Sequence, residues 1–246
     1  MMMIYDLKDV FISFSPFFFV CLFAGNIISV LMFLSPVKTF IRIVKNKSTE
    51  EFESLPYICT LLNSSLWTYY GIIKPGSYLV STVNGFGVIV EIIYVSLFLT
   101  YAPPKLKKKI GVLAGILDVG FFVAAISVAQ FVLTGDARID VIGFMCSGLN
   151  IVMYGSPLAA MKTVVTTQSV EYMPFLLSFF LFLNGGVWTF YAVLQQDWYL
   201  LVPNGMGFLL GIAQVALYAI YRDRKPKPID IEEASHRQHL LPTSSA

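Results

Sequence analysis

The chain has 246 residues, of which 57% are hydrophobic and only 13% are charged. Because a soluble domain carries about 25% charged residues, this composition indicates an integral membrane protein. A formal net charge of +2 gives no reason to expect a nucleic-acid partner. The two histidines, His236 and His239, lie in the polar C-terminal tail, and the three cysteines have no metal-like spacing. We therefore expect no metal, no cofactor, no catalytic residue and no enzymatic activity.

Seven segments are apolar and long enough to cross about 30 Å of hydrocarbon as helices. We expect spans near residues 14–35, 55–73, 78–101, 110–134, 139–161, 173–195 and 198–221. The apolar run of the first segment is longer than that of a signal peptide, so we retain it as a span. The sequence therefore predicts an all-α membrane protein with seven transmembrane helices.

The basic residues predict the orientation of these helices. Most of the 17 lysines and arginines lie in the first, third and fifth connections or in the C-terminal tail, and only Lys8, Lys74 and Arg138 lie on the other side. Basic connections are retained in the cytosol. We therefore expect a luminal or extracellular N-terminus and a cytosolic C-terminus. The tail, residues 222–246, is polar, charged and proline-containing, which is typical of disordered chain.

The chain contains an internal repeat. The sequence WTYYG at 67–71 recurs as WTFYA 121 positions later. Further matches at the same or nearly the same offset pair Ser35-Pro36 with Ser156-Pro157, and Asn84-Gly-Phe-Gly with Asn204-Gly-Met-Gly. Such self-similarity indicates a duplicated unit, and the even number of spans between the two starts makes the repeats parallel. We expect a first triple-helix repeat with an N-terminal extension at 1–101, a linker helix at 102–135, a second triple-helix repeat at 136–221 and the tail at 222–246.

Two tryptophans within the spans are candidates for a binding site. Trp67 and Trp188 each follow an asparagine by four positions, Asn63 and Asn184, which places amide and indole on one helical face. Tryptophan in a span is also used as an interfacial anchor. Both tryptophans, however, lie about two-thirds of the way through their spans. The depth of the two tryptophans in their spans and the recurrence of the same Asn–Trp spacing in both repeats favour a cavity that the two repeats share.

Three further asparagines lie in the spans. Asn84 and Asn204 are both followed by glycine, and Asn150 lies in the fifth span. Membrane asparagines also hydrogen-bond neighbouring helices, but repetition in both halves favours a cavity. A carboxamide offers both donors and an acceptor, which suits the hydroxyl groups of a sugar, and an indole face suits its C–H groups. The lack of a charged clamp indicates an uncharged solute.

Four prolines fall at corresponding positions near the cytosolic ends of the spans, namely Pro36, Pro56, Pro157 and Pro174. Proline removes a backbone donor and kinks a helix, so we favour hinges that close one end of a central pathway. The alternative is that these prolines only begin or end helices.

Two acids, Glu91 and Asp118, lie in or near the hydrocarbon, where ionisable residues are costly and suggest function. Neither has a counterpart in the other repeat. A neutral, hydrogen-bonded packing role and a role in proton coupling both remain open. We favour uncoupled facilitation, with a proton-coupled exporter of the PQ-loop type as the alternative.

Several motifs between about Gly25 and Arg222 resemble those of the plant SWEET sugar facilitators, namely GNIISVLMFLSPVKTF, NKSTEEFESLPY, WTYYG, VNGFG, YGSPLAAMKTVV, TQSVEYMPF and VPNGMGF. The resemblance implies two parallel three-helix repeats joined by a linker helix. SWEET transporters are themselves an example of parallel repeats with a solute site at the interface. It also implies alternating access, transport of mono- or disaccharides down their gradient, and a homo-oligomer within membrane lipid.

The resemblance also assigns roles to particular residues. Asn84 and Asn204 match the central asparagines, and Trp67 and Trp188 match the tryptophans that stack on sugar. The first-span pocket positions match at Ser29 and Met32, the positions associated with sugar size hold Asn150 and Met153, the extrafacial gate matches Tyr70 with Asp197, and the proline tetrad matches Pro36, Pro56, Pro157 and Pro174.

The side chains at the two size-associated positions indicate a hexose pocket rather than a sucrose pocket. Tyr191, the counterpart of Tyr70, is not assigned to the gate because no acid matches it. The segments YICTLLNSSLWTYYG and FLNGGVWTFYA look most like the tonoplast branch, which implies fructose or glucose transport across the vacuolar membrane.

Overall fold

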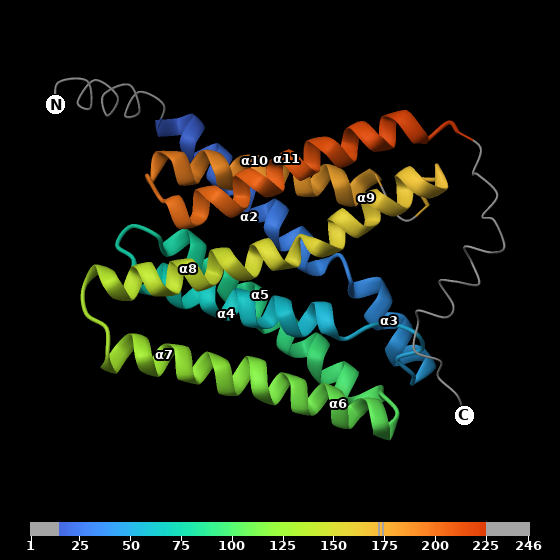
Figure 1. Ribbon diagram of the computed structural model, residues 1–246, viewed down its shortest axis with the longest axis horizontal. Coiled ribbons are helices and arrows are strands. Elements are labelled where there is room, and N and C mark those ends of the chain that lie inside the picture. The colour runs from blue at the N-terminus through green and yellow to red at the C-terminus, as the bar shows by residue number, and fades with distance from the viewer. Residues whose placement is uncertain (1–14, 172, 174, 225–246) are drawn as a thin grey trace.

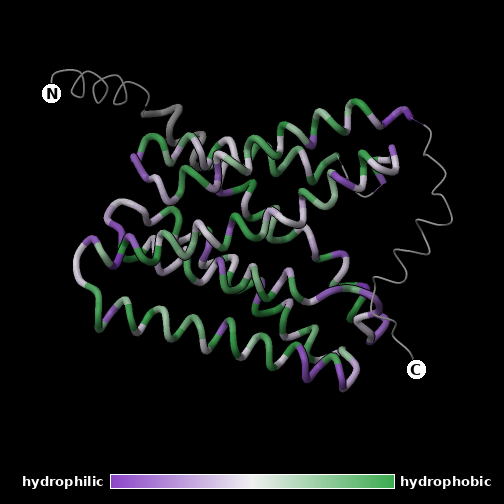
Figure 2. Tube along the Cα trace, in the orientation of Figure 1, coloured by the Kyte–Doolittle hydropathy of each residue, from purple (hydrophilic) through white to green (hydrophobic). Residues whose placement is uncertain are grey.

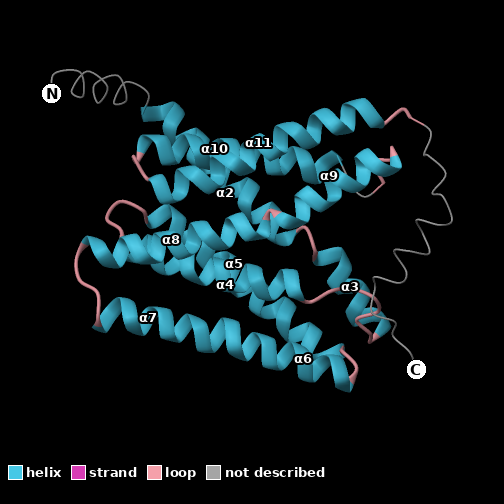
Figure 3. Cartoon of the chain, in the orientation of Figure 1, coloured by secondary structure: helices cyan, strands magenta, loops and turns pink. Residues whose placement is uncertain are grey.

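The structure is a computed structural model that describes residues 15–171, 173 and 175–224. The N-terminal extension before Ser15, the hinge candidate Pro174 and the tail beyond residue 224 lie outside the described residues. Within the described part the chain consists of helices and loops (Figure 3). In chain order the helices are α2 (Ser15–Leu34), α3 (Val37–Asn46), α4 (Leu55–Ile73), α5 (Tyr78–Tyr101), α6 (Pro104–Ala114), the π-helical segment η1 (Gly115–Phe121), α7 (Phe122–Phe131), α8 (Asp136–Met153), α9 (Gly155–Thr167), α10 (Phe175–Leu194) and α11 (Trp198–Tyr221).

The first and fifth spans each continue, after a turn, as a second helix. Residues 37–46 were expected as a loop, whereas the expected span 139–161 already included the first half of α9. After α2, the chain turns at Ser35 and Pro36 and resumes as α3, which carries Lys38, Arg42 and Lys45. After α8, it turns at Tyr154 and resumes as α9. The basic residues of the segment 37–46 led us to expect a loop there. They are compatible with helix because α3 is amphipathic and buries its apolar face.

Helix α4 is more polar than α2 and α5, the other two spans of the first repeat. Six helical stretches of the described chain are long and apolar enough to cross a membrane by composition alone, and α4 is not among them. Its sequence includes Asn63, Ser64, Ser65 and Thr68. Much of α4 is nevertheless buried in protein. A helix that faces other helices rather than lipid does not need a uniformly apolar surface.

Each repeat places its third helix between its first two. Helix α5 packs against both α2 and α4, and α11 packs in the same way against α8 and α10. The repeats meet where α4 packs on α8 and where α10 packs on α2. The linker formed by α6, η1 and α7 lies along the outside of the first repeat, at the bottom of Figure 1. This arrangement gives the predicted layout of three helices, one linker and three helices.

The two ends of the bundle differ in polarity. Helices α3, α6 and α9 gather at one end, and the turns between α4 and α5 and between α10 and α11 lie at the other (Figure 1). Hydrophobic residues dominate the lengths of the helices, and hydrophilic residues collect at their ends and in the loops (Figure 2). The basic-residue argument predicts that the end with α3, α6 and α9 faces the cytosol. We call the opposite end the luminal end.

Glycine allows α10 and α11 to approach closely. A Cβ atom at Gly211 would lie 2.6 Å from the Cα atom of Phe182. We expect Gly211→Ala to lower the apparent Tm of the purified protein in detergent by about 5 °C because backbone would have to move. Gly115→Ala is the matched control, since a Cβ there meets nothing within 4 Å. Equal melting curves for the two variants would contradict the close approach.

Candidate functional site

The two tryptophans lie in one buried cluster at the interface between the repeats. Trp67 on α4 is 3% exposed and Trp188 on α10 is 7% exposed. The Nε1 atom of Trp67 donates to Oδ1 of Asn150 on α8 at 3.5 Å, and Nε1 of Trp188 donates to Oγ of Ser29 on α2 at 3.0 Å. Ser29 and Asn150 are themselves 121 positions apart. Each tryptophan therefore bonds the equivalent position on the first helix of the other repeat.

The second-repeat tryptophan belongs to a longer chain of hydrogen bonds. Ser29 accepts from Trp188 and donates to Oδ1 of Asn184 at 2.7 Å. Asn184 thereby contacts a side chain that Trp188 also contacts, as their spacing predicted. In the first repeat, Oδ1 of the equivalent Asn63 is buried and accepts no hydrogen bond within the described chain. Burying a carbonyl oxygen without a hydrogen-bond donor costs free energy. Asn63 Oδ1 is therefore available to accept a hydrogen bond from a ligand.

The other predicted pocket residues also occupy matching positions in the two repeats. Asn84 Nδ2 donates to the carbonyl of Val80 at 2.8 Å, and Asn204 Nδ2 donates to the carbonyl of Leu200 at 2.8 Å. Each amide thus bonds its own helix one turn earlier. Both asparagines are half-buried, as are the equivalent methionines Met32 and Met153 at the ends of α2 and α8. The roles of these residues in binding remain predictions.

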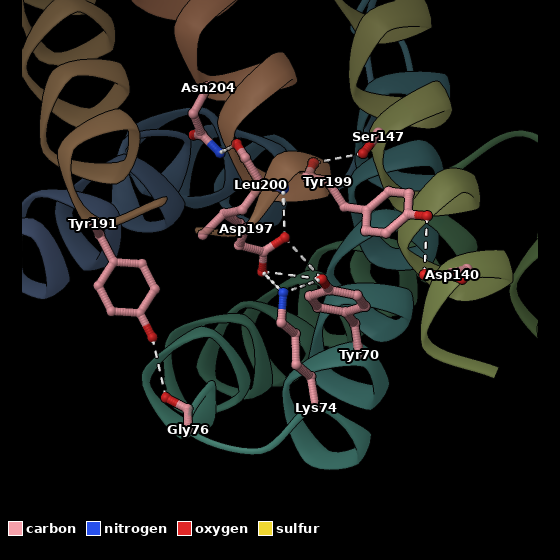
Figure 4. A network of polar contacts seen from close by, with 10 residues as sticks. All are labelled: Tyr70, Lys74, Gly76, Asp140, Ser147, Tyr191, Asp197, Tyr199, Leu200 and Asn204. Atoms are coloured by element: carbon pink, nitrogen blue, oxygen red, sulfur yellow. Dashed lines mark hydrogen bonds and ion pairs between the residues drawn. The ribbon is translucent and has the colours of Figure 1, made fainter. Parts of the chain in front are cut away.

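The predicted gate pair is in contact at the luminal end, as Figure 4 shows. Tyr70 Oη donates to the carboxylate of Asp197, with distances of 2.9 and 3.0 Å to its two oxygens. Asp197 lies at the N-terminus of α11 and is 1% exposed. It also accepts from the backbone N–H of Leu200 at 3.2 Å. This contact ties the end of α4 in the first repeat to the start of α11 in the second.

Lys74 supplies the positive charge that the sequence reading did not assign to the gate. Its Nζ lies 2.7 Å from Oδ2 of Asp197 and donates to Tyr70 Oη at 3.0 Å. A buried carboxylate requires such a partner, because an unpaired charge is expensive to desolvate. The signal was present in the sequence, since Lys74 follows Tyr70 by one helical turn. We used Lys74 only as evidence of orientation.

The three hinge candidates within the described residues lie at the starts of helices. Pro36 precedes the first residue of α3, Pro56 is in the first turn of α4, and Pro157 is in the first turn of α9. Two of them, Pro36 and Pro157, follow a break within a span. The positions fit helix starts, and the hinge role remains a prediction.

The acids Glu91 and Asp118 lie at the contact between the first repeat and the linker. Glu91 on α5 is buried close to Asp118 of η1 and to the tyrosines Tyr57 and Tyr94. Glu91 Oε2 and both carboxylate oxygens of Asp118 accept no hydrogen bond within the described chain. The packing role anticipated from the sequence included hydrogen bonds, and these are not formed by the three oxygens. Among the residues that the structure describes, no hydrogen bond joins either acid to a residue of the predicted site.

A separate groove lies towards the cytosolic end. It has a volume of about 550 Å³ and is lined by Met161, Lys162, Val165, Thr166, Ala213, Ala216, Leu217 and Ile220. These residues belong to α9 and α11. The predicted site residues do not line it, because they lie at the interface between the repeats.

Comparison with known proteins gives the same picture of a duplicated unit. The family model described as sugar efflux transporter for intercellular exchange matches the chain twice, over residues 18–106 and 140–226. Bidirectional sugar transporter SWEET17 of Arabidopsis thaliana is 64% identical over 203 residues, which cover 82% of this chain and 84% of that protein. Bidirectional sugar transporter SWEET16 of Arabidopsis thaliana is 59% identical over 219 residues, which cover 88% of this chain and 95% of that protein.

A solved structure of a eukaryotic SWEET transporter at 3.7 Å resolution matches with a TM-score of 0.79 and 40% sequence identity. The match covers 84% of this chain and 97% of that chain. The predicted fold of two parallel three-helix repeats and a linker is therefore confirmed.

The ion pair between Lys74 and the buried Asp197 predicts non-additive effects on stability. We expect Lys74→Met to lower the apparent Tm in detergent by about 5–10 °C, because it leaves the Asp197 charge buried without its partner. The double variant Lys74→Met/Asp197→Asn should recover part of that loss, since the buried charge is then absent. Thermal unfolding of the two single variants and the double variant measures the coupling. Strictly additive shifts would contradict a direct interaction.

Proposed function

The chain belongs to the family of sugar efflux transporters for intercellular exchange, and from that membership we propose that it carries sugar across a membrane in both directions by facilitated diffusion. The relatives named above are bidirectional sugar transporters rather than enzymes. The observation that carries the proposal for this chain is the pair of cross-repeat hydrogen bonds made by Trp67 and Trp188.

The chemistry of this interface suits a neutral polyol. Two indole rings and four carboxamides, those of Asn63, Asn184, Asn84 and Asn204, come from equivalent positions of the two repeats. Carboxamides both donate and accept hydrogen bonds, and Asn63 Oδ1 is buried without a donor. Sugar hydroxyls can replace the contacts that Ser29 and Asn150 make to the indole N–H groups. The sugar would then lie between the repeats.

We propose that transport proceeds by alternating access. The contacts of Tyr70 and Lys74 with Asp197 close the luminal end. Opening that end separates α4 from the start of α11, and this movement requires the buried carboxylate to gain water or another partner. The breaks near Pro36 and Pro157 would let the cytosolic parts of the first and fifth spans, α3 and α9, move separately from α2 and α8.

Hexoses are the proposed substrates, with fructose and glucose favoured. Asn150 and Met153 occupy the positions that the resemblance associates with sugar size, and Asn150 also bonds Trp67. These two side chains leave less room than the smaller residues expected for sucrose. The resemblance to the tonoplast branch supports the vacuolar membrane as the location, with the C-terminus in the cytosol. We further propose a homo-oligomer within membrane lipid, as the resemblance implies.

Uptake into proteoliposomes tests the substrate and the mechanism together. We expect radiolabelled fructose or glucose to enter until it reaches equilibrium, and to enter much faster than sucrose. An imposed pH gradient should leave that final level unchanged, because Glu91 and Asp118 form no hydrogen bond with a site residue in the described chain. Accumulation above equilibrium under a proton gradient would instead favour the proton-coupled alternative.

A further inference from the structure

Tyr191 repeats, in the second half of the chain, the position of Tyr70 in the first. The same offset of 121 that relates these tyrosines also relates Gly76 to Asp197. Tyr70 Oη donates to the side chain of Asp197, and Tyr191 Oη donates to the backbone carbonyl of Gly76 at 3.3 Å. The two hydrogen bonds therefore run between the repeats in opposite directions, as Figure 4 shows. The two donors occupy equivalent positions in the repeats, and so do the two accepting residues. The accepting groups differ, since one is a carboxylate and the other is a backbone carbonyl.

The surroundings of the Tyr191 bond are those of a closed contact. Tyr191 is 1% exposed, and Ser77, which follows Gly76, is equally buried. Gly76 has a φ of +81°, a conformation that glycine adopts without strain and other residues rarely adopt. This backbone conformation fixes the direction of the Gly76 carbonyl. The turn between α4 and α5 thus presents a preformed acceptor to a buried tyrosine of α10.

Both tyrosines also contact the tryptophan of their own helix in the same way. The ring centroids of Trp67 and Tyr70 are 5.2 Å apart with an interplanar angle of 86°. Those of Trp188 and Tyr191 are 5.5 Å apart at 82°. Edge-to-face packing of this kind is geometrically restrictive. A shift of either tryptophan on sugar binding would therefore displace the neighbouring tyrosine.

From these observations we propose that Tyr191 and the Gly76 carbonyl form a second latch of the luminal gate, related to the Tyr70–Asp197 latch by the internal repeat. The first latch is ionic, because it includes Lys74, and the second is neutral. Opening the luminal end requires both to break. This proposal rests on the proposed transport function, but its test does not require transport.

Cys146 provides a native reporter of gate opening. It is fully buried on α8, in the same cluster as both tyrosines. In a Cys21→Ser/Cys59→Ser background, the rate of alkylation of Cys146 by a polar maleimide reports how often the luminal end opens. We expect Tyr191→Phe to raise this rate about five-fold, the effect of losing one neutral hydrogen bond. Tyr70→Phe should raise it about ten-fold or more, because its acceptor is charged.

Tyr94→Phe is the matched control. Tyr94 is also a buried tyrosine that donates to a backbone carbonyl, that of Phe33 at 3.0 Å, but this bond lies within the first repeat. We expect it to leave the alkylation rate of Cys146 at the parent value. A Tyr191→Phe rate equal to that of the parent, or a Tyr94→Phe rate as high as that of Tyr191→Phe, would overturn the proposal.

Gly76→Ala provides a second route to the same contact if Tyr191→Phe fails to fold. Alanine disfavours the positive φ, so the Gly76 carbonyl should turn away from Tyr191 and the alkylation rate should again rise. No rise in a folded Gly76→Ala variant would count against the latch. If both variants accelerate alkylation but the parent protein moves no sugar into proteoliposomes, the proposed function fails and the latch stands.

Discussion

The structure depends on the contact in which each repeat holds the tryptophan of the other. Trp67 donates to α8 and Trp188 donates to α2, at positions that the internal repeat makes equivalent. Because the contacts are reciprocal, neither repeat completes the interface alone. The polar groups of α4 and α10 are consequently placed between helices instead of facing lipid. Because these polar side chains contact other helices and not lipid, the free-energy cost of placing them within the spans is reduced.

Contacts between the two repeats also join them at the luminal end. The buried carboxylate of Asp197 is stabilised by the half-buried ammonium group of Lys74, so in the proposed mechanism this ion pair favours the closed end and has to be accommodated when that end opens. Tyr70 links that pair to Trp67 through an edge-to-face contact. The proposed solute site and the proposed gate are therefore in direct contact. In the proposed alternating-access mechanism, such contact lets a movement at the solute site reach the gate directly.

Much of the fold and part of the site could be predicted from the sequence. Long apolar segments and a 121-residue offset defined the spans, the parallel repeats and the equivalence of the tryptophans. Helix α3 was missed because its basic residues were interpreted as a loop, whereas an amphipathic helix tolerates them. The break between α8 and α9 was missed because the expected span 139–161 runs through it. The hydrogen bond of Tyr191 was not predicted because its acceptor is the backbone carbonyl of Gly76. Every residue has such a carbonyl, so the sequence does not identify the partner. The π-helical segment Gly115–Phe121 lies within the expected span 110–134, and no local pattern in the sequence distinguishes it from α-helix.

The central claim is that a sugar lies between Trp67 and Trp188, and affinity measurements on tryptophan variants test it most directly. Dissociation constants for a hexose can be measured on purified protein for Trp67→Ala, Trp188→Ala and the control Trp198→Ala, whose side chain is 70% exposed. We expect each of the first two changes to weaken binding by about ten-fold or more, equivalent to 1.4 kcal/mol, and the control to leave it unchanged. Unchanged affinity in either Trp67→Ala or Trp188→Ala would contradict a site shared by the two repeats.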